Sequence, residues 1–190
     1  MLIVNLNIRG VGGSTKTRYL RHIIAKEGAE FACIQETKLR TCTDVKCFSL
    51  WGDNNVGWVH YGGENGSGSL LTMWHKDAFT YESHEMGKGF IAVVGQHTKS
   101  NCRCVVVNVY SACLLREKID LWGNLSAIKG ASLDPIWCFC GDFNAIRKRG
   151  ERKGTSVRDN HTSEMGSFNN FIESNMLIEL PIVGKKIHLV

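Results

Sequence analysis

The sequence predicts an α/β fold in which helices flank two packed β-sheets. Short segments with the length of strands alternate with segments whose apolar residues recur at helical spacing, and this alternation favours a layered architecture. The 190 residues are 43% hydrophobic, which is enough to bury one sizeable core. A single domain over residues 1–190, without linkers or repeats, is therefore expected.

Six segments are expected to be strands. The first, over residues 2–8, alternates apolar and polar residues, so that Asn5 and Asn7 share one face. Residues 31–38 form a short apolar run that ends in a carboxylate, Glu36. Residues 136–139 have the bulk of a buried core strand, and Gly141 beyond them lets a ligand approach the backbone closely. The other three strands are expected at 69–74, 90–97 and 102–110.

Three helices are expected between and after these strands. The first runs from about Ser14 to Glu27, follows a capping turn over residues 10–14 and is closed by Gly28. Apolar stripes at positions 115, 119, 122 and 125 and at positions 165, 168, 172 and 176 mark the other two. We interpret the Met and aromatic residues of these stripes as core residues without a cofactor role.

Polar side chains stand at the ends of three predicted strands. Asp142 and Asn144 follow one strand, Glu36 ends another, and Asn7 lies near the end of the first. Each has a plain alternative, because Asp and Asn form turns and a lone Glu is usually a solvated charge. Ligands of layered α/β folds bind at strand ends, and Mg²⁺ prefers oxygen ligands while retaining several waters. Together the three strand ends indicate a phosphate-handling metal site.

Two other patterns do not meet the requirements of a binding site. The segment 10–17 lies where a phosphate-binding loop would, but Thr15 replaces the Gly that the motif requires before Lys-Thr. The eight cysteines include two C-x-C pairs, at 102/104 and 138/140, whose spacing differs from that of structural zinc sites. We expect buried free thiols instead.

Four motifs, in order along the chain, resemble the endonuclease/exonuclease/phosphatase superfamily. They are Asn7-Ile8-Arg9-Gly10, Gln35-Glu36-Thr37-Lys38, Asn108-Val109-Tyr110-Ser111 and Gly141-Asp142-Phe143-Asn144. The residues of these motifs are most similar to those of the endonuclease domain of plant LINE-type (non-LTR) retrotransposons, which is related to the apurinic endonucleases and deoxyribonuclease I. The resemblance implies a four-layer α/β sandwich of two packed, mainly antiparallel sheets flanked by helices.

The resemblance also implies a role for each site residue. Glu36 would be the principal ligand of Mg²⁺, with Mn²⁺ as a substitute, and Asn7 would support the metal–phosphate cluster. Tyr110 would donate a hydrogen bond to the phosphate. Asp142 and Asn144 would orient the attacking water and stabilise the developing charge.

The resemblance fails at the C-terminus. The family ends with a Thr-Trp strand, a basic segment and a Ser-Asp-His motif whose His is the general base, and the chain reaches Val190 before any of them. His188 stands where the preceding strand is expected, so we do not assign it this role. We therefore expect a C-terminally truncated domain that lacks the final strands and the catalytic His segment.

A basic loop follows Asn144. A phosphate backbone of DNA is the expected partner of such a loop, although a merely solvated loop is the alternative. The net charge of +5 is too mild to decide between them. The basic residues are Arg147, Lys148, Arg149, Arg152 and Lys153.

Three hypotheses about function remain. The first is Mg²⁺-dependent phosphodiester hydrolysis by a retroelement-derived domain of the DNA endonuclease type, impaired by truncation; an intact element would carry a reverse transcriptase domain downstream. The second is a non-catalytic relic that at most binds nucleic acid or metal. The third is a phosphatase or deadenylase relative. Because no signal peptide and no apolar run of membrane-spanning length are found, we expect an intracellular protein, nuclear or cytoplasmic, without a membrane partner.

Overall fold

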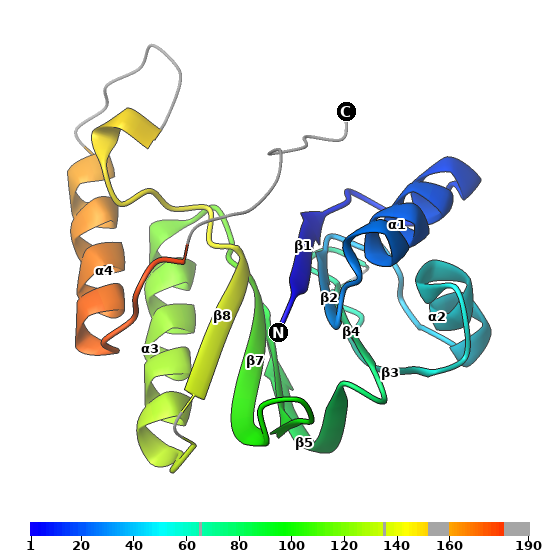
Figure 1. Cartoon of the computed structure of the whole chain (residues 1–190). Helices are drawn as coiled ribbons and strands as arrows, with labels where there is room; N and C mark the ends of the chain where they lie inside the picture. The colour runs from blue at the N-terminus through cyan, green and yellow to red at the C-terminus, as the bar shows by residue number, and fades with distance from the viewer. Residues whose placement is uncertain (65, 135, 152–159, 181–190) are drawn as a thin grey trace. The chain divides into compact units, whose positions relative to one another are not determined.

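The computed structural model describes residues 1–64, 66–134, 136–151 and 160–180. The chain divides into two compact units. The first consists of Met1–Tyr110 and Asp134–Asp142, and the second of Ser111–Leu133 and Phe143–Val190. Both β-sheets and helices α1 and α2 belong to the first unit, whereas helices α3 and α4 belong to the second (Figure 1).

The first sheet has the strand order β1-β2-β4-β3. Its strands are β1 (Ile3–Asn7), β2 (Phe31–Gln35), β3 (Val56–Tyr61) and β4 (Leu70–His75). Strands β1 and β2 are parallel, with Asn7 opposite Gln35 at their ends, and the other two pairs are antiparallel. A parallel pair requires a crossover connection, which α1 (Ser14–Glu27) supplies.

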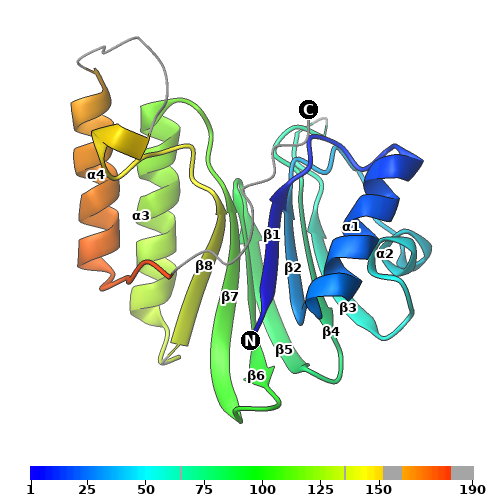
Figure 2. The same ribbon diagram turned by 45° about the horizontal axis from the view of Figure 1, so that its top comes forward.

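Helices α1 and α2 (Asp44–Trp51) lie on the same side of this sheet (Figure 2). Helix α1 has the predicted bounds, and it ends as expected at Gly28, whose left-handed φ of 62° suits glycine. The capping turn is only partly as predicted, because the N-cap is Gly13 and no side chain caps the helix. Helix α2 is capped by Thr43, whose side chain accepts a hydrogen bond from the backbone N–H of Lys46.

The second sheet has the strand order β5-β6-β7-β8. Its strands are β5 (Phe79–Gly87), β6 (Phe90–His97), β7 (Cys102–Tyr110) and β8 (Ile136–Asp142). The pairs β5–β6 and β6–β7 are antiparallel, and β7 and β8 are parallel, with Tyr110 opposite Asp142 at their ends. Each sheet thus contains one parallel and two antiparallel pairs, which confirms the prediction of mainly antiparallel sheets.

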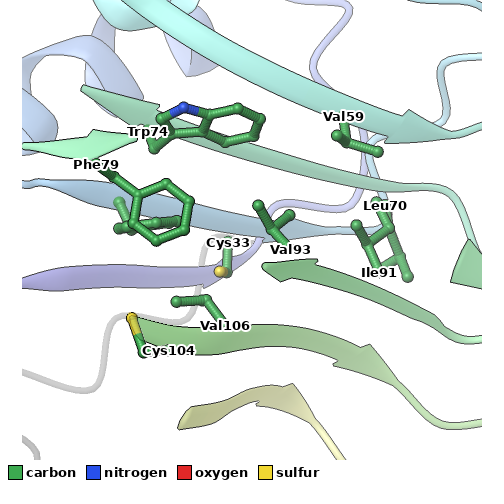
Figure 3. Packing of buried hydrophobic residues seen from close by; sticks show 10 residues of the cluster. Cys33, Val59, Leu70, Trp74, Phe79, Ile91, Val93, Cys104 and Val106 are labelled. Atoms are coloured by element: carbon green, nitrogen blue, oxygen red, sulfur yellow. The ribbon is translucent and has the colours of Figure 1, made fainter. Parts of the chain in front are cut away.

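The core of the first unit lies between the two sheets (Figure 3). The rings of Phe31 in β2 and Phe79 in β5 meet edge to face, with centroids 4.8 Å apart. Burial of such aromatic and branched side chains is the main stabilising contribution of this unit. The predicted α/β fold with two packed sheets is confirmed. The cluster comprises Phe31, Cys33, Val59, Leu70, Trp74, Phe79, Ile91, Val93, Cys104 and Val106.

Helices α3 (Leu115–Ala131) and α4 (Asn160–Ser174) lie side by side in the second unit (Figure 1). The indole of Trp122 packs against the rings of Phe168 and Phe171, at centroid distances of 5.1 and 6.2 Å. A single turn of 3-10 helix spans Arg149–Glu151. None of the helices in the described ranges is both long and apolar enough to cross a membrane.

Several sequence predictions are wrong in detail. Strand β8 is not a buried core strand: among the described strands it pairs with β7 alone, Ile136 is exposed and the other residues of β8 are half-buried. The stripe of α3 buries Leu121 and leaves Ile119 exposed, and Met176 is exposed beyond the end of α4. Strands β3 and β5 and helix α2 were not predicted.

Candidate functional site

Four of the predicted site residues of the first unit lie at the carboxyl ends of parallel strands. Asn7, Tyr110 and Asp142 are the last residues of β1, β7 and β8, and Glu36 immediately follows β2. Parallel strands end at the same edge of a sheet, so each parallel pair brings two of these residues together. The two pairs approach each other through β1 and β8, where the amide of Asn5 donates to the carbonyl of Gly141 at 3.4 Å.

One amide joins the two carboxylates of the site. The Nδ2 group of Asn7 donates to Oε1 of Glu36 at 2.8 Å and to Oδ2 of Asp142 at 3.0 Å. Along the chain, Asn7 is 29 residues from Glu36 and 135 residues from Asp142. Hydrogen bonds to ionised carboxylates are among the stronger ones in proteins, so Asn7 holds both acids in a defined place.

The backbone of Glu36 adopts an unusual conformation, with a φ of 54° in the left-handed region. Its carbonyl accepts a hydrogen bond of 2.6 Å from the Gly10 N–H, and the next residue, Thr37, donates its N–H to the carbonyl of Ser69. Arg9, two residues beyond the end of β1, has a φ of 49° as well. Strained residues persist where their surroundings hold them, and they gather at functional sites. The sequence carries no signal for this feature, because neither residue is a glycine.

The donor set of the site fits Mg²⁺ or Mn²⁺. The Oδ1 oxygen of Asn7 is buried and, within the described part of the chain, has no hydrogen-bond partner. A buried acceptor without a partner is costly, and a cation beside it would satisfy it. Glu36 would hold the ion, with Asp142 and the Asn7 oxygen beside it. No group of three or more His, Cys, Asp or Glu side chains that could hold a metal ion is found among the described residues. Mg²⁺ is commonly bound by only one or two carboxylates and keeps several waters.

A buried polar network, which the sequence analysis did not single out, supports these strand ends. The Nε2 group of Gln35 donates to Oδ1 of Asn5 and to Oδ1 of Asn108, both at 2.7 Å. The amide of Asn108 donates in turn to the carbonyl of Leu71 at 3.1 Å. Gln35 and Asn108 are fully buried polar residues, and they belong to the second and third motifs. Gln35 and Asn108 stand shortly before Glu36 and Tyr110 in these motifs, and this place in the sequence could have pointed to their supporting role.

Tyr110 and Asp142 face each other in register at the ends of β7 and β8. The Tyr110 ring is half-buried and packs against the core between the sheets, while its backbone N–H donates to the carbonyl of Gly89 at 2.8 Å. Gly141 also has a structural reason within the sheet. A Cβ at position 141 would lie 1.9 Å from the carbonyl oxygen of Val109, so the neighbouring strand already requires glycine there.

Asn144 belongs to the second unit and has a left-handed φ of 48°. Its side-chain amide donates to the carbonyl of Ser111 at 2.7 Å. The ammonium group of Lys118, a buried residue of α3, donates to the backbone carbonyl of Asn144 and pairs with Glu164 of α4 at 2.9 Å. The sequence analysis missed Lys118, because a lysine on an amphipathic helix is normally exposed.

Arg147 and Lys148 of the basic loop differ in their surroundings. The guanidinium of Arg147 donates to Oδ1 of Asn169 at 3.1 Å and pairs with Glu179 at 3.5 Å, so this side chain has structural partners. Lys148 is exposed. Arg149 lies in the 3-10 turn, and Arg152 and Lys153 lie outside the described residues.

Two histidines of the first unit, His84 and His97, hydrogen-bond to other side chains. His97 lies 3.5 Å from a carboxylate oxygen of Glu30 and hydrogen-bonds to Ser100. His84 hydrogen-bonds to the hydroxyl of Tyr81, and burial lowers the pKa of His60. His188 lies outside the described residues.

The chain belongs to the endonuclease/exonuclease/phosphatase family, because the model of that family matches residues 4–177. This match includes all four motifs and every predicted site residue. No curated protein matches the sequence.

Solved structures share the fold at low sequence identity. The AP endonuclease LMAP from Leishmania major has a TM-score of 0.66 at 15% identity, with 91% of this chain and 66% of that chain covered. The human Nocturnin catalytic domain with bound sulfate anion has a TM-score of 0.60 at 15% identity, with coverages of 90% and 68%. D. rerio TDP2 complexed with single strand DNA product has a TM-score of 0.57 at 14% identity, with coverages of 86% and 64%. The chain thus spans about two thirds of the length of these structures.

Proposed function

We propose that the chain carries a divalent-metal-dependent phosphodiesterase site that acts on DNA, in the manner of an endonuclease. The observation that carries this proposal is the bridge formed by the Asn7 amide between the carboxylates of Glu36 and Asp142 at 2.8 and 3.0 Å. Two acids held at a strand edge, beside a buried amide oxygen that has no hydrogen-bond partner among the described residues, suit a hard cation and a phosphate.

Each residue has a defined task in this proposal. Glu36 holds Mg²⁺, or Mn²⁺ in its place, and the ion when bound neutralises charge on the phosphoryl oxygens and on the leaving group. Asn7 keeps the Glu36 and Asp142 carboxylates in position. Asp142 orients the attacking water, and Tyr110 donates to the phosphate. Asn144 stabilises the developing charge.

Three observations support DNA as the substrate class. The chain belongs to a family named for endonucleases, exonucleases and phosphatases. An AP endonuclease and a TDP2 complexed with a single strand DNA product share its fold. The basic loop that starts at Arg147 offers an exposed cation at Lys148 for a phosphate backbone.

A nicking assay tests the proposal. Supercoiled plasmid is incubated with the chain and Mg²⁺ or Mn²⁺, and a panel of inositol phosphates is tested in parallel. Nicking should require the metal and should be lost in Glu36→Gln and Asp142→Ala, while Glu85→Gln, at an exposed position of β5, retains it. Turnover of the inositol phosphates without nicking would instead favour the phosphatase alternative.

The finer proposal is a retroelement endonuclease of the plant LINE type, which the wording of the four motifs supports. None of the seven histidines stands in a Ser-Asp-His motif. A positioned general base contributes ~10²–10⁴-fold to a rate. Fusing the Ser-Asp-His segment of a close relative after Val190 should therefore raise nicking by about that factor, and Asp142→Ala in the fusion should remove it. If the fusion remains inactive while Glu36-dependent metal binding persists, the chain is a non-catalytic relic.

A further inference from the structure

Two thiols lie in contact at the start of helix α2. The Sγ atoms of Cys42 and Cys47 are 3.3 Å apart, and both residues are free cysteines. A disulfide bond is about 2.05 Å long, so the two sulfur atoms need to move about 1.2 Å closer to bond. A rotation about the side-chain torsions of Cys42, which lies outside the helix, can supply a movement of this size.

The local structure distinguishes the two thiols. Cys42 immediately precedes the N-cap Thr43 and is half-buried, whereas Cys47 lies within α2 and is fully buried. A helix N-terminus and a nearby cation both favour a thiolate over a thiol. Lys46, on the first turn of α2, is that cation, and its ammonium group is held at the carbonyl of Val11 at 2.9 Å. Lys46 lowers the pKa of Cys42 whereas the carboxylate of Asp44 raises it, so Cys42 differs from Cys47 in its greater exposure and its place at the helix N-terminus.

We propose that Cys42 and Cys47 are a redox-active dithiol pair whose substrate is a small peroxide. In the first step the sulfur of Cys42 attacks hydrogen peroxide, the O–O bond breaks, and Cys42 sulfenic acid and one water form. In the second step the sulfur of Cys47 attacks that sulfenic sulfur, and the hydroxyl leaves as a second water with the proton of the Cys47 thiol. The two thiols lose two electrons to the peroxide, and a thiol reductant then returns the disulfide to two thiols and is itself oxidised to a disulfide.

The directions of the pKa shifts of Cys42 and Cys47 agree with a reaction in which Cys42 attacks the peroxide first. The hydrogen bond from the Cys47 thiol is the main cause that lowers the pKa of Cys42. The same contact, together with burial, raises the pKa of Cys47 far above its usual range. The more acidic thiol is thus also the more accessible one, as the attacking position requires.

A second thiol contact lies in the core between the sheets. Cys140 hydrogen-bonds with Cys33, and this contact and burial raise the pKa of Cys140 well above its usual value. Cys33 is fully buried, so a peroxide reaches this pair less readily than Cys42. The Cys42–Cys47 pair should accordingly react first.

Peptide mapping of the full chain tests the proposal. Trypsin cleaves after Arg40, Lys46 and Lys76, so Cys42 and Cys47 fall into the separate peptides 41–46 and 47–76, each with one cysteine. After brief treatment with hydrogen peroxide and alkylation of the remaining thiols, these two peptides should run as one crosslinked species that reduction separates. The intact protein should lose two hydrogen atoms in mass, and two fewer cysteines should be alkylated.

Three variants complete the experiment. Cys42→Ser should leave Cys47 alkylatable after peroxide, and Cys47→Ser should accumulate a sulfenic acid on Cys42 that dimedone traps. Cys113→Ser, which removes an exposed cysteine of the second unit, should leave the crosslink unchanged. Full alkylation of Cys42 and Cys47 in the peroxide-treated wild-type chain would overturn the proposal, as would a crosslink that joins Cys42 to any other cysteine.

Discussion

The ammonium group of Lys118 lies 2.9 Å from Oε1 of Glu164, although the Lys118 side chain is only 3% exposed. This ion pair joins α3 to α4, and the same ammonium group also donates to the backbone carbonyl of Asn144. A buried cation is tolerated only when its partners satisfy it. Lys118 therefore links the helical packing of the second unit to the conformation of a residue that the family resemblance assigns to the site.

Loss of the Lys118 ammonium should destabilise the second unit. Lys118→Met removes the partner of Glu164, and breaking a buried pair costs about 3–5 kcal/mol. The double variant Lys118→Met/Glu164→Leu should recover much of this loss, because it leaves no unpaired charge. Urea unfolding measures both, with Arg116→Met on the exposed face of α3 as the control within about 0.5 kcal/mol of wild type. An equal loss in the single and double variants would contradict the role of the pair.

Removal of the Glu36 carboxylate should abolish stabilisation by divalent ions. A ligand present at 100 times its dissociation constant stabilises a fold by about 2.7 kcal/mol. Thermal unfolding with and without Mg²⁺ or Mn²⁺ should show such a shift in wild type and in Glu85→Gln, but not in Glu36→Gln, whose melting temperature without metal should stay close to wild type. Equal shifts in Glu36→Gln and wild type would exclude Glu36 as the ligand.

Glu30 should make stability depend on pH in the acidic range. Burial alone would raise the pKa of Glu30, but hydrogen bonds from Lys99 and the Leu2 backbone lower it from 4.5 to about 2. Because the folded pKa is the lower one, the stabilisation is present above pH 4.5 and is lost as the pH falls towards 2. Glu30→Gln should reduce stability at pH 7 by about 1–2 kcal/mol and flatten the pH dependence between these limits. Unfolding curves at several pH values check this; parallel pH profiles of variant and wild type would contradict it.

The basic loop should separate into structural and DNA-binding residues. Neutralising Lys148, Arg149, Arg152 and Lys153 together should weaken duplex binding for all sequences and reduce the salt slope by about 0.9 for each DNA phosphate that the loop no longer neutralises. Arg147→Ala should mainly lower stability, because Arg147 is bonded to Asn169. Duplex titrations at several salt concentrations, with unfolding curves alongside, measure both effects. Unchanged affinity and slope in the fourfold variant would make this a solvated loop.

Helix α1 and strands β6 and β7 were predictable because each carries its signal within its own residues. Helix α1 carries an apolar stripe and ends at a glycine, and β6 and β7, which have the predicted bounds, each contain a run of apolar residues rich in Val. Strand β5 was missed because most of its residues are exposed, so no alternation marks it. Strand β8 is half-buried and, among the described strands, pairs with β7 alone, a position in the sheet that no local pattern encodes.

By itself the sequence determined the family and the α/β class, because helical and strand periods and the residues of a motif are local properties. Only the tertiary structure decided that the Asn7 amide joins Glu36 and Asp142, since this contact depends on the register of two parallel pairs and on the approach of β1 to β8. Lys118 likewise became a buried partner of Glu164 only through the packing of α3 on α4. Hydrogen bonds between residues far apart along the chain arise from its topology, whereas helical and strand periods arise from neighbours along the chain.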